Sequence, residues 1–152
     1  TFGCRLNIAE SEVIKREATL AGIDNAVVVN PCAVTSEAVR QARQNIRRIK
    51  RERPDARIVV TGCAAQSEPA TFAAMPEVDR VLGNEEKLDG RAWNGDARVA
   101  VGDIMAVKTL TAHGVDHIDG HTRAFVQVQN SCDHRCTHGD RWYLRDELPI
   151  HA

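Results

Sequence analysis

Short runs of β-branched residues alternate with longer stretches of helical periodicity along the first half of the chain. The clearest runs are Val27–Val29 and Ile58–Val60, and a helix-like segment follows each of them. Runs of this kind, about one βαβ unit apart, are typical of parallel strands joined by helices. The pattern predicts an α/β fold of three layers, with a mostly parallel sheet and flanking helices. The expected strands cover residues 26–30, 57–61 and 78–82, and the expected helices cover 8–21, 35–53 and a stretch after 66.

Capping signals set the expected ends of the first two helices. In the first, Asn7 is the expected N-cap, Glu10 its capping-box partner and Gly22 the stop. In the second, Thr35 is the expected N-cap and Pro54 ends the helix after about Arg53. The residues expected to face the core are Val13, Ile14 and Leu20 in the first helix and Val39, Ala42, Ile46 and Ile49 in the second.

The character of the chain changes beyond Leu82, where glycine and acidic residues become frequent. We interpret residues 1–88 as the α/β unit and residues 89–122 as a linker with short strands, one of them around residues 97–101. A clearer strand is expected at residues 123–129, at the start of a further unit over residues 123–137. Residues 138–152 form a separate tail.

Composition limits the kind of protein this is. With 152 residues and 43% hydrophobic content, the chain can bury one core, and its formal net charge of -1 does not demand a polyanionic partner. No apolar run approaches the length of a membrane span, so no membrane association is expected. The five cysteines are an odd number and no secretory signal opens the chain. Reduced thiols in a cytoplasmic protein are therefore expected rather than disulfides.

Three cysteines stand at one repeating kind of position. Cys32 and Cys63 each follow a β-branched run, and Cys4 precedes the first helix-like stretch. Because the carboxyl ends of parallel strands lie along one edge of a sheet, the three thiols are expected to share that edge, where ligands bind in open α/β sheets. Thiols gathered in this way suggest a metal or iron–sulfur site. The alternative is that they are buried, inert thiols.

A second constellation, Cys132 and Cys136 in C-x3-C spacing, follows the strand expected at residues 123–129. Four segments then form one pattern: Thr1–Asn7 with Glu10–Glu12, Val29–Thr35, Thr61–Gln66 and Val128–Thr137. Together they resemble the radical-SAM tRNA methylthiotransferases over residues 1 to about 137. The Gly-Cys-Arg-Leu-Asn form of the first segment is most similar to the branch that acts on threonylcarbamoyl-adenosine beside the anticodon.

The resemblance implies two cofactor sites. Cys4, Cys32 and Cys63 correspond to the ligands of an auxiliary [4Fe–4S] cluster that retains one iron without a protein ligand. A second [4Fe–4S] cluster, held in the family by C-x3-C-x2-C, chelates S-adenosylmethionine, and Cys132 and Cys136 match its first two ligands. The family uses these cofactors to add a methylthio group to a modified adenosine of tRNA.

The chain departs from the family pattern after Thr137. Gly139 stands where the third ligand of the S-adenosylmethionine cluster is expected, and the neighbouring His138 and Asp140 are poor substitutes. A frameshift, a truncated gene or residues added in cloning each explain the tail. We expect a fragment that lacks the first strand and nearly all of the catalytic barrel, and that does not catalyse the reaction alone. An unpaired sheet edge left by the missing strand favours self-association.

The second expected helix carries a concentration of positive charge. Its cations are Arg40, Arg43, Arg47, Arg48, Lys50, Arg51 and Arg53, and its acidic residues are Glu37 and Glu52. Such a face suits phosphate contact, so Arg40, Arg43, Arg47 and Arg51 are candidate RNA-contact residues, with a merely solvated face as the alternative. Two functions stay open: a cluster-binding piece of a tRNA-modifying transferase, and a non-catalytic, metal-free α/β module that acts only as a folded or oligomeric unit.

Overall fold

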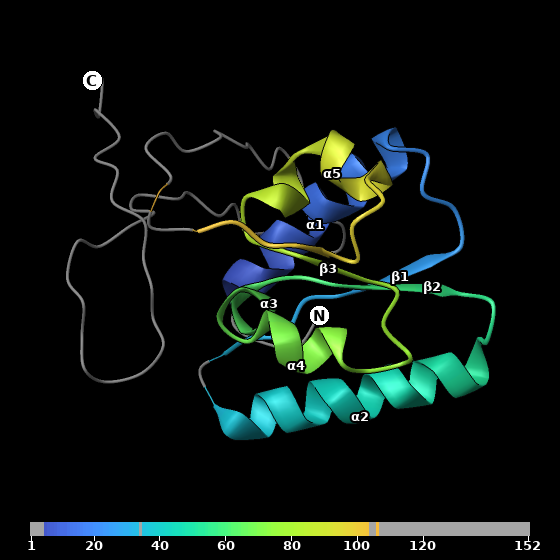
Figure 1. Cartoon of the computed structure of the whole chain (residues 1–152), viewed down its shortest axis with the longest axis vertical. Coiled ribbons are helices and arrows are strands. Elements are labelled where there is room, and N and C mark those ends of the chain that lie inside the picture. Colours follow the sequence, from blue (N-terminus) through green and yellow to red (C-terminus); the bar gives the residue numbers. More distant parts are fainter. Residues whose placement is uncertain (1–4, 34, 104–105, 107–152) are drawn as a thin grey trace.

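The structure is a computed structural model that describes residues 5–33, 35–103 and 106, with side chains described from Glu10 onward (Figure 1). The strand expected at residues 123–129, Cys4, Cys132, Cys136 and the tail lie outside the described residues. The helices are α1 (Arg5–Leu20), α2 (Ser36–Glu52), α3 (Cys63–Ser67), α4 (Pro69–Ala73) and α5 (Gly90–Asn94), with a 3-10 turn η1 (Glu86–Leu88). The strands are β1 (Ala26–Val29), β2 (Arg57–Val60), β3 (Arg80–Leu82) and β4 (Val99–Ala100).

The four strands form one parallel sheet in the order β1-β2-β3-β4. Val29 of β1 is level with Val60 of β2, and Val81 of β3 is level with Val99 of β4. Each strand therefore ends at the same edge of the sheet, as the alternation of strands and helices predicts. The predicted α/β class with a parallel sheet is confirmed.

Helices cover both faces of this sheet and give the three expected layers. Figure 1 shows α2, α3 and α4 on one side of the sheet and α1 and α5 on the other. Ile46 of α2 and Phe72 of α4 are buried with Ile58 and Val60 in the first core. The second core is smaller and contains Ile14, Ala18, Val59, Leu82 and Trp93.

The first helix differs from its prediction at both ends. It already includes Arg5, so Asn7 lies inside the helix and is not its cap. The C-terminal end is a Schellman turn, in which the Ile23 amide donates to the Ala18 carbonyl (3.0 Å) and Gly22 adopts a φ of 68°. Ile23 packs on the second core from this turn, whereas Leu20 is 74% exposed. Gly22 is therefore the stop as predicted, and the inward placement of Leu20 is wrong.

The second helix agrees with its prediction. The Thr35 side chain accepts a hydrogen bond from the Ala38 amide (3.1 Å), and the helix ends before the cap residue Arg53. Ala42 and Ile46 are fully buried, and the partly buried Val39 and Ile49 pack on the first core. This confirms the predicted cap and apolar stripe.

Two later segments differ in extent from their prediction. The helical stretch expected after Gln66 begins at Cys63 and is divided where Pro69 starts α4. Residues 89–101, which the sequence places in a linker, contain α5 and β4. The short strand expected there is found, and it extends the sheet through pairing with β3. The sheet therefore continues past residue 88.

Candidate functional site

The edge formed by the carboxyl ends of β1 and β2 brings two predicted ligands to equivalent positions. Each residue of β1 is level with the β2 residue 31 places further along, from Ala26 with Arg57 to Val29 with Val60. Cys32 and Cys63 have the same separation in sequence, and the Ala64 amide donates to the Pro31 carbonyl (3.3 Å) between the two loops. Adjacent strands lie about 4.8 Å apart. The two cysteines therefore leave the sheet side by side, Cys32 with 7% of its surface exposed and Cys63 at the surface.

Gly62 makes this close approach of the loops feasible. Its backbone has φ 89° and ψ -172°, a conformation that is essentially restricted to glycine. A Cβ atom at this position would lie 2.0 Å from Asn30 Oδ1 and 3.2 Å from the Pro31 carbonyl oxygen. The loop that delivers Cys63 therefore packs on the loop that delivers Cys32 with no space for a side chain between them.

A buried ion pair lies at the same edge. The Lys87 ammonium, with only 3% of its side chain exposed, lies 3.1 Å from the Glu10 carboxylate and donates to Asn84 Oδ1 at 2.9 Å. The same carboxylate oxygen of Glu10 accepts a bond from Asn30 Nδ2 at 3.4 Å. The predicted capping-box role of Glu10 is wrong, because its carboxylate instead pairs with groups that follow β1 and β3.

Further hydrogen bonds connect the loops after β2, β3 and β4. The Gln66 side chain accepts from the Asn84 amide (2.9 Å) and donates to the Gly102 carbonyl (3.0 Å). The Gly102 amide in turn donates to the Glu86 carboxylate at 2.8 Å. Polar side chains from α1, α3 and η1 therefore hold the carboxyl edge in one arrangement.

The donor chemistry at this edge fits part of an iron–sulfur ligand set. Cysteine thiolates are the usual protein ligands of such clusters, and two of the three predicted thiols are brought to neighbouring strand ends. Within the described ranges, no group of three or more His, Cys, Asp or Glu side chains is arranged to hold a metal ion. Cys4, the third predicted ligand, precedes those ranges, as α1 begins one residue after it.

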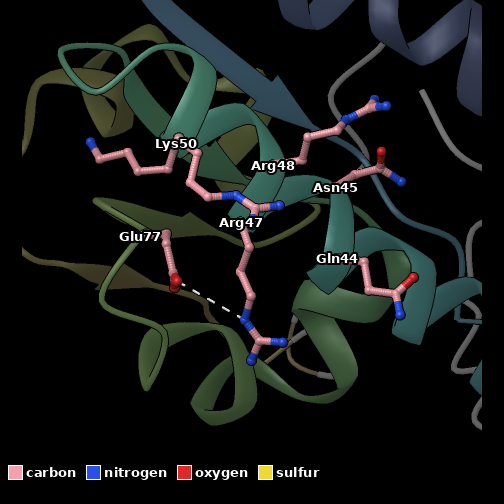
Figure 2. Close-up of a pocket in the computed structure, with 7 residues that line it drawn as sticks. Gln44, Asn45, Arg47, Arg48, Lys50 and Glu77 are labelled. Carbon is pink, nitrogen blue, oxygen red and sulfur yellow. Dashed lines mark ion pairs between the residues drawn. The ribbon is translucent and has the colours of Figure 1, made fainter.

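The exposed side of α2 carries the predicted basic face. Seven residues line a groove of about 640 Å³ there: Gln44, Asn45, Arg47, Arg48, Lys50, Arg51 and Glu77. Figure 2 shows the side chains of Arg47, Arg48 and Lys50 spread over this surface, with Arg47 directed toward Glu77. The Arg47–Glu77 ion pair is long at 4.0 Å. The groove therefore holds four cations and one carboxylate.

The predicted RNA-contact residues differ in their surroundings. Arg40 forms two hydrogen bonds, of 2.7 and 2.8 Å, with the Glu37 carboxylate, and Gln41 donates to the same group. These bonds from Arg40 and Gln41 lower the pKa of Glu37 to about 2. Arg43 is half-buried, and its Nε atom has no hydrogen-bond partner in the described part of the chain. Arg47 and Arg51 line the groove, so they are the two of the four predicted residues that belong to this surface.

Sequence reasoning missed three residues that shape this part of the molecule. Lys87 and Asn84 follow β3 as the cysteines follow β1 and β2, so the rule that selected the cysteines could have found them. Trp93 is 1% exposed, and its Nε1 donates to the Lys87 carbonyl at 3.1 Å. The sequence carries no signal for its burial, because it lies in a polar region.

No helix among the described residues has the length and apolar character needed to cross a lipid bilayer.

Comparison with known proteins identifies relatives over most of the chain. The model of the family described as "Uncharacterized protein family UPF0004" matches residues 1–83. A threonylcarbamoyladenosine tRNA methylthiotransferase MtaB of Rickettsia prowazekii is 53% identical over 138 residues, which cover 90% of this chain and 33% of that protein. The enzyme of the same name from Bacillus subtilis is 32% identical, covering 90% of this chain and 34% of the relative.

A more distant relative carries a different name. A tRNA-2-methylthio-N(6)-dimethylallyladenosine synthase of Desulfotalea psychrophila is 28% identical, covering 91% of this chain and 35% of that protein. No solved structure is significantly similar to the chain. The chain spans about a third of the length of the curated relatives that it matches. With more than half of its residues matched by the family model and tRNA methylthiotransferases as its relatives, the chain belongs to the UPF0004 family.

Proposed function

We propose that this chain is the N-terminal, cluster-binding part of a tRNA methylthiotransferase that modifies threonylcarbamoyl-adenosine beside the anticodon. The observation that carries the proposal is that Cys32 and Cys63 each lie three residues past the last paired position of two adjacent parallel strands. The relatives that support the substrate are named threonylcarbamoyladenosine tRNA methylthiotransferases. A tRNA substrate also implies a cytoplasmic location.

Cys4, Cys32 and Cys63 are the residues that would hold the auxiliary [4Fe–4S] cluster. Three thiolates leave one of four irons without a protein ligand, and the bound cluster supplies sulfur chemistry at that open position. The residues of this chain fix the direction of the ligands: β1 and β2 set the spacing of two of them, and Gly62 allows their loops to touch. Cys132 and Cys136 would contribute to the second cluster, which binds S-adenosylmethionine. With Gly139 at the third position, this chain alone has an incomplete ligand set for it.

The basic groove on α2 is our proposed contact with the RNA backbone. Arg47 lies about 16 Å along the helix from Ser36, at 1.5 Å per residue, and Ser36 is at the helix end nearest the cysteine loops. The groove is therefore suited to phosphates at a distance from the modified base. Counterion release makes such binding salt-dependent. Each phosphate contact contributes about 0.7 to 0.9 to the slope of log Kd against log salt.

Fluorescence anisotropy with labelled tRNA over a series of salt concentrations tests this contact. The double variant Arg47→Gln/Arg51→Gln is expected to reduce the slope of log Kd against log salt by about 1.5. Arg91→Gln is a matched control, because Arg91 is 92% exposed on α5, across the sheet from α2. Equal slopes for the wild type and the double variant would contradict the contact and favour a merely solvated face.

Nucleoside analysis tests the proposed substrate. Bulk tRNA from cells with and without the gene for the full-length protein that contains this chain is digested and measured by mass spectrometry. Loss of the methylthio mass on threonylcarbamoyl-adenosine, with the dimethylallyl-adenosine products unchanged, is the expected result. Unchanged threonylcarbamoyl products would contradict the assignment.

The alternative is a metal-free α/β module that acts through self-association. One observation favours it: in the described residues β1 pairs only with β2, which leaves its other edge as the end of the sheet. Sedimentation of the iron-free chain tests this alternative, because it predicts a dimer or larger species, and a monomer would contradict it.

A further inference from the structure

The buried ion pair at the carboxyl edge has no role in the function proposed above, and its position is unusual. Lys87 retains only 3% exposure of its side chain, and its ammonium is surrounded by Glu10 and Asn84. Burial of the lysine charge beside Glu10, whose side chain is 20% exposed, costs desolvation free energy, so apolar residues of similar volume often give equal or better stability. A buried pair of this kind is best explained by the arrangement that it imposes on its neighbours.

The ion pair touches the segments that carry the predicted cluster ligands. Glu10 belongs to α1, the helix that begins directly after Cys4. Its carboxylate accepts a bond from Asn30, which lies two residues before Cys32. Asn30 in turn packs closely against Gly62, which directly precedes Cys63. A Cβ atom on Gly62 would lie 2.0 Å from the side-chain amide oxygen of Asn30.

We infer that Lys87, Glu10 and Asn30 form a positioning cluster that holds the Cys32 and Cys63 loops in the arrangement needed for shared ligation. The inference rests on the proposed function, because it assigns these residues to the same ligand site. Lys87 fixes the Glu10 carboxylate, which orients the Asn30 amide against the backbone of Gly62. Asn84 anchors the lysine to the loop after β3. None of the three is a catalytic residue, since each acts through the cysteine loops.

A dithiol probe tests the arrangement without iron. Phenylarsine oxide binds tightly only where two thiols lie within reach of one arsenic atom, and here Cys4, Cys132 and Cys136 are replaced by Ser so that it reports on the remaining pair. The full chain is studied under a non-thiol reductant. Lys87→Met keeps the length of the side chain and removes its charge, which leaves the Glu10 carboxylate without its ammonium. We expect at least a tenfold weaker affinity for phenylarsine oxide in this variant.

Lys50→Met is the matched control. Lys50 also pairs with a carboxylate, that of Asp79 at 3.4 Å, but this pair is 28% and 41% exposed and belongs to α2 and the approach to β3. Its loss is expected to leave the affinity for phenylarsine oxide within twofold of the wild type. A purely structural role for Lys87 would lower the midpoint of unfolding and leave the affinity of the folded fraction unchanged, which would overturn the inference.

A milder variant covers the case in which Lys87→Met does not fold. Glu10→Gln removes the charge but keeps an oxygen that can accept from Asn30, so we expect an affinity about threefold weaker, and Glu10→Ala a larger loss. Wild-type affinity in a folded Glu10→Ala variant would refute the positioning role.

Failure of this inference and failure of the proposed function give different results. If the wild type binds no iron but the probe affinity depends on Lys87, the positioning role of Lys87, Glu10 and Asn30 is supported and the proposed iron–sulfur function is refuted. If the wild type binds iron but the probe affinity is the same in Lys87→Met, the inference falls alone.

Discussion

Replacing Gly62 by Ala tests the closest contact of the candidate site. The alanine must adopt φ 89° and ψ -172°, which costs about 1–3 kcal/mol for a residue with a side chain. Its Cβ would also lie 2.0 Å from Asn30 Oδ1, and overpacking of this kind costs about 1–3 kcal/mol more. Asn30 cannot move away at low cost, because it is 2% exposed and donates to Glu10.

We therefore expect Gly62→Ala to lower the free energy of unfolding by about 2–6 kcal/mol, a large share of the total for a domain that is stable by about 5–15 kcal/mol. Urea unfolding followed by far-UV circular dichroism measures this loss. Phenylarsine oxide binding to Cys32 and Cys63 reports on the molecules that remain folded, in which displaced loops are expected to lower its affinity.

Two other glycines separate the contributions of conformation and contact. Gly22 also has a positive φ, 68°, but no atom lies within 4 Å of the position that a Cβ would take, so Gly22→Ala isolates the backbone cost of about 1–2 kcal/mol. Gly90 starts α5 in open space with no positive φ, and Gly90→Ala is expected to be neutral or stabilising by about 0.4–1 kcal/mol. The reasoning is refuted if Gly62→Ala loses no more stability than Gly22→Ala.

Three further predictions follow from burial and charge. Trp93→Ala is expected to lower the free energy of unfolding by about 3–5 kcal/mol in the same urea assay, because Trp93 is 1% exposed in the second core, and a change under 1 kcal/mol would contradict its packing. Leu20→Ala is expected to change it by less than about 0.5 kcal/mol, because Leu20 is 74% exposed, and a core-sized loss would contradict the Schellman turn. The pKa of Glu37 is about 2, below its ordinary value of 4.5, so its stabilising effect is present above pH 4.5 and is lost as the pH falls toward 2. An NMR titration of the Glu37 carboxyl should show this midpoint, and Arg40→Gln should move it up toward 4.5; an unchanged midpoint would contradict the role of Arg40.

The sequence predicts the sheet well because its signals are local. The β-branched runs before Cys32 and Cys63 are short and sharply bounded, and Thr35 caps α2 through a bond to a residue three places away. The rule that parallel strands end at one edge then predicts that Cys32 and Cys63 share that edge. Each of these inferences uses only a short window and the rule that parallel strands end at one edge.

The parts that sequence reasoning missed depend on distant partners. Glu10 has the spacing of a capping box, yet its carboxylate pairs with Lys87 and Asn30 from loops far along the chain. A lysine among acidic residues after a glycine is typical of a solvated loop, so its burial can be recognised only once α1 is placed over β3. Leu20 has the periodicity of the inward face, but the Schellman turn brings Ile23 to the core instead.

The most direct test of the account is the iron and sulfide content of the anaerobically reconstituted chain. Cys132 and Cys136 are replaced by Ser so that only the auxiliary site is counted, and the same protein with Cys4, Cys32 and Cys63 changed to Ala is the control. We predict about four iron atoms and about four sulfides per chain, with broad absorption near roughly 400 nm, and loss of both in the control. An iron content well below about four atoms per chain, or the same iron content in the two proteins, would contradict the claim that these cysteines hold one cluster.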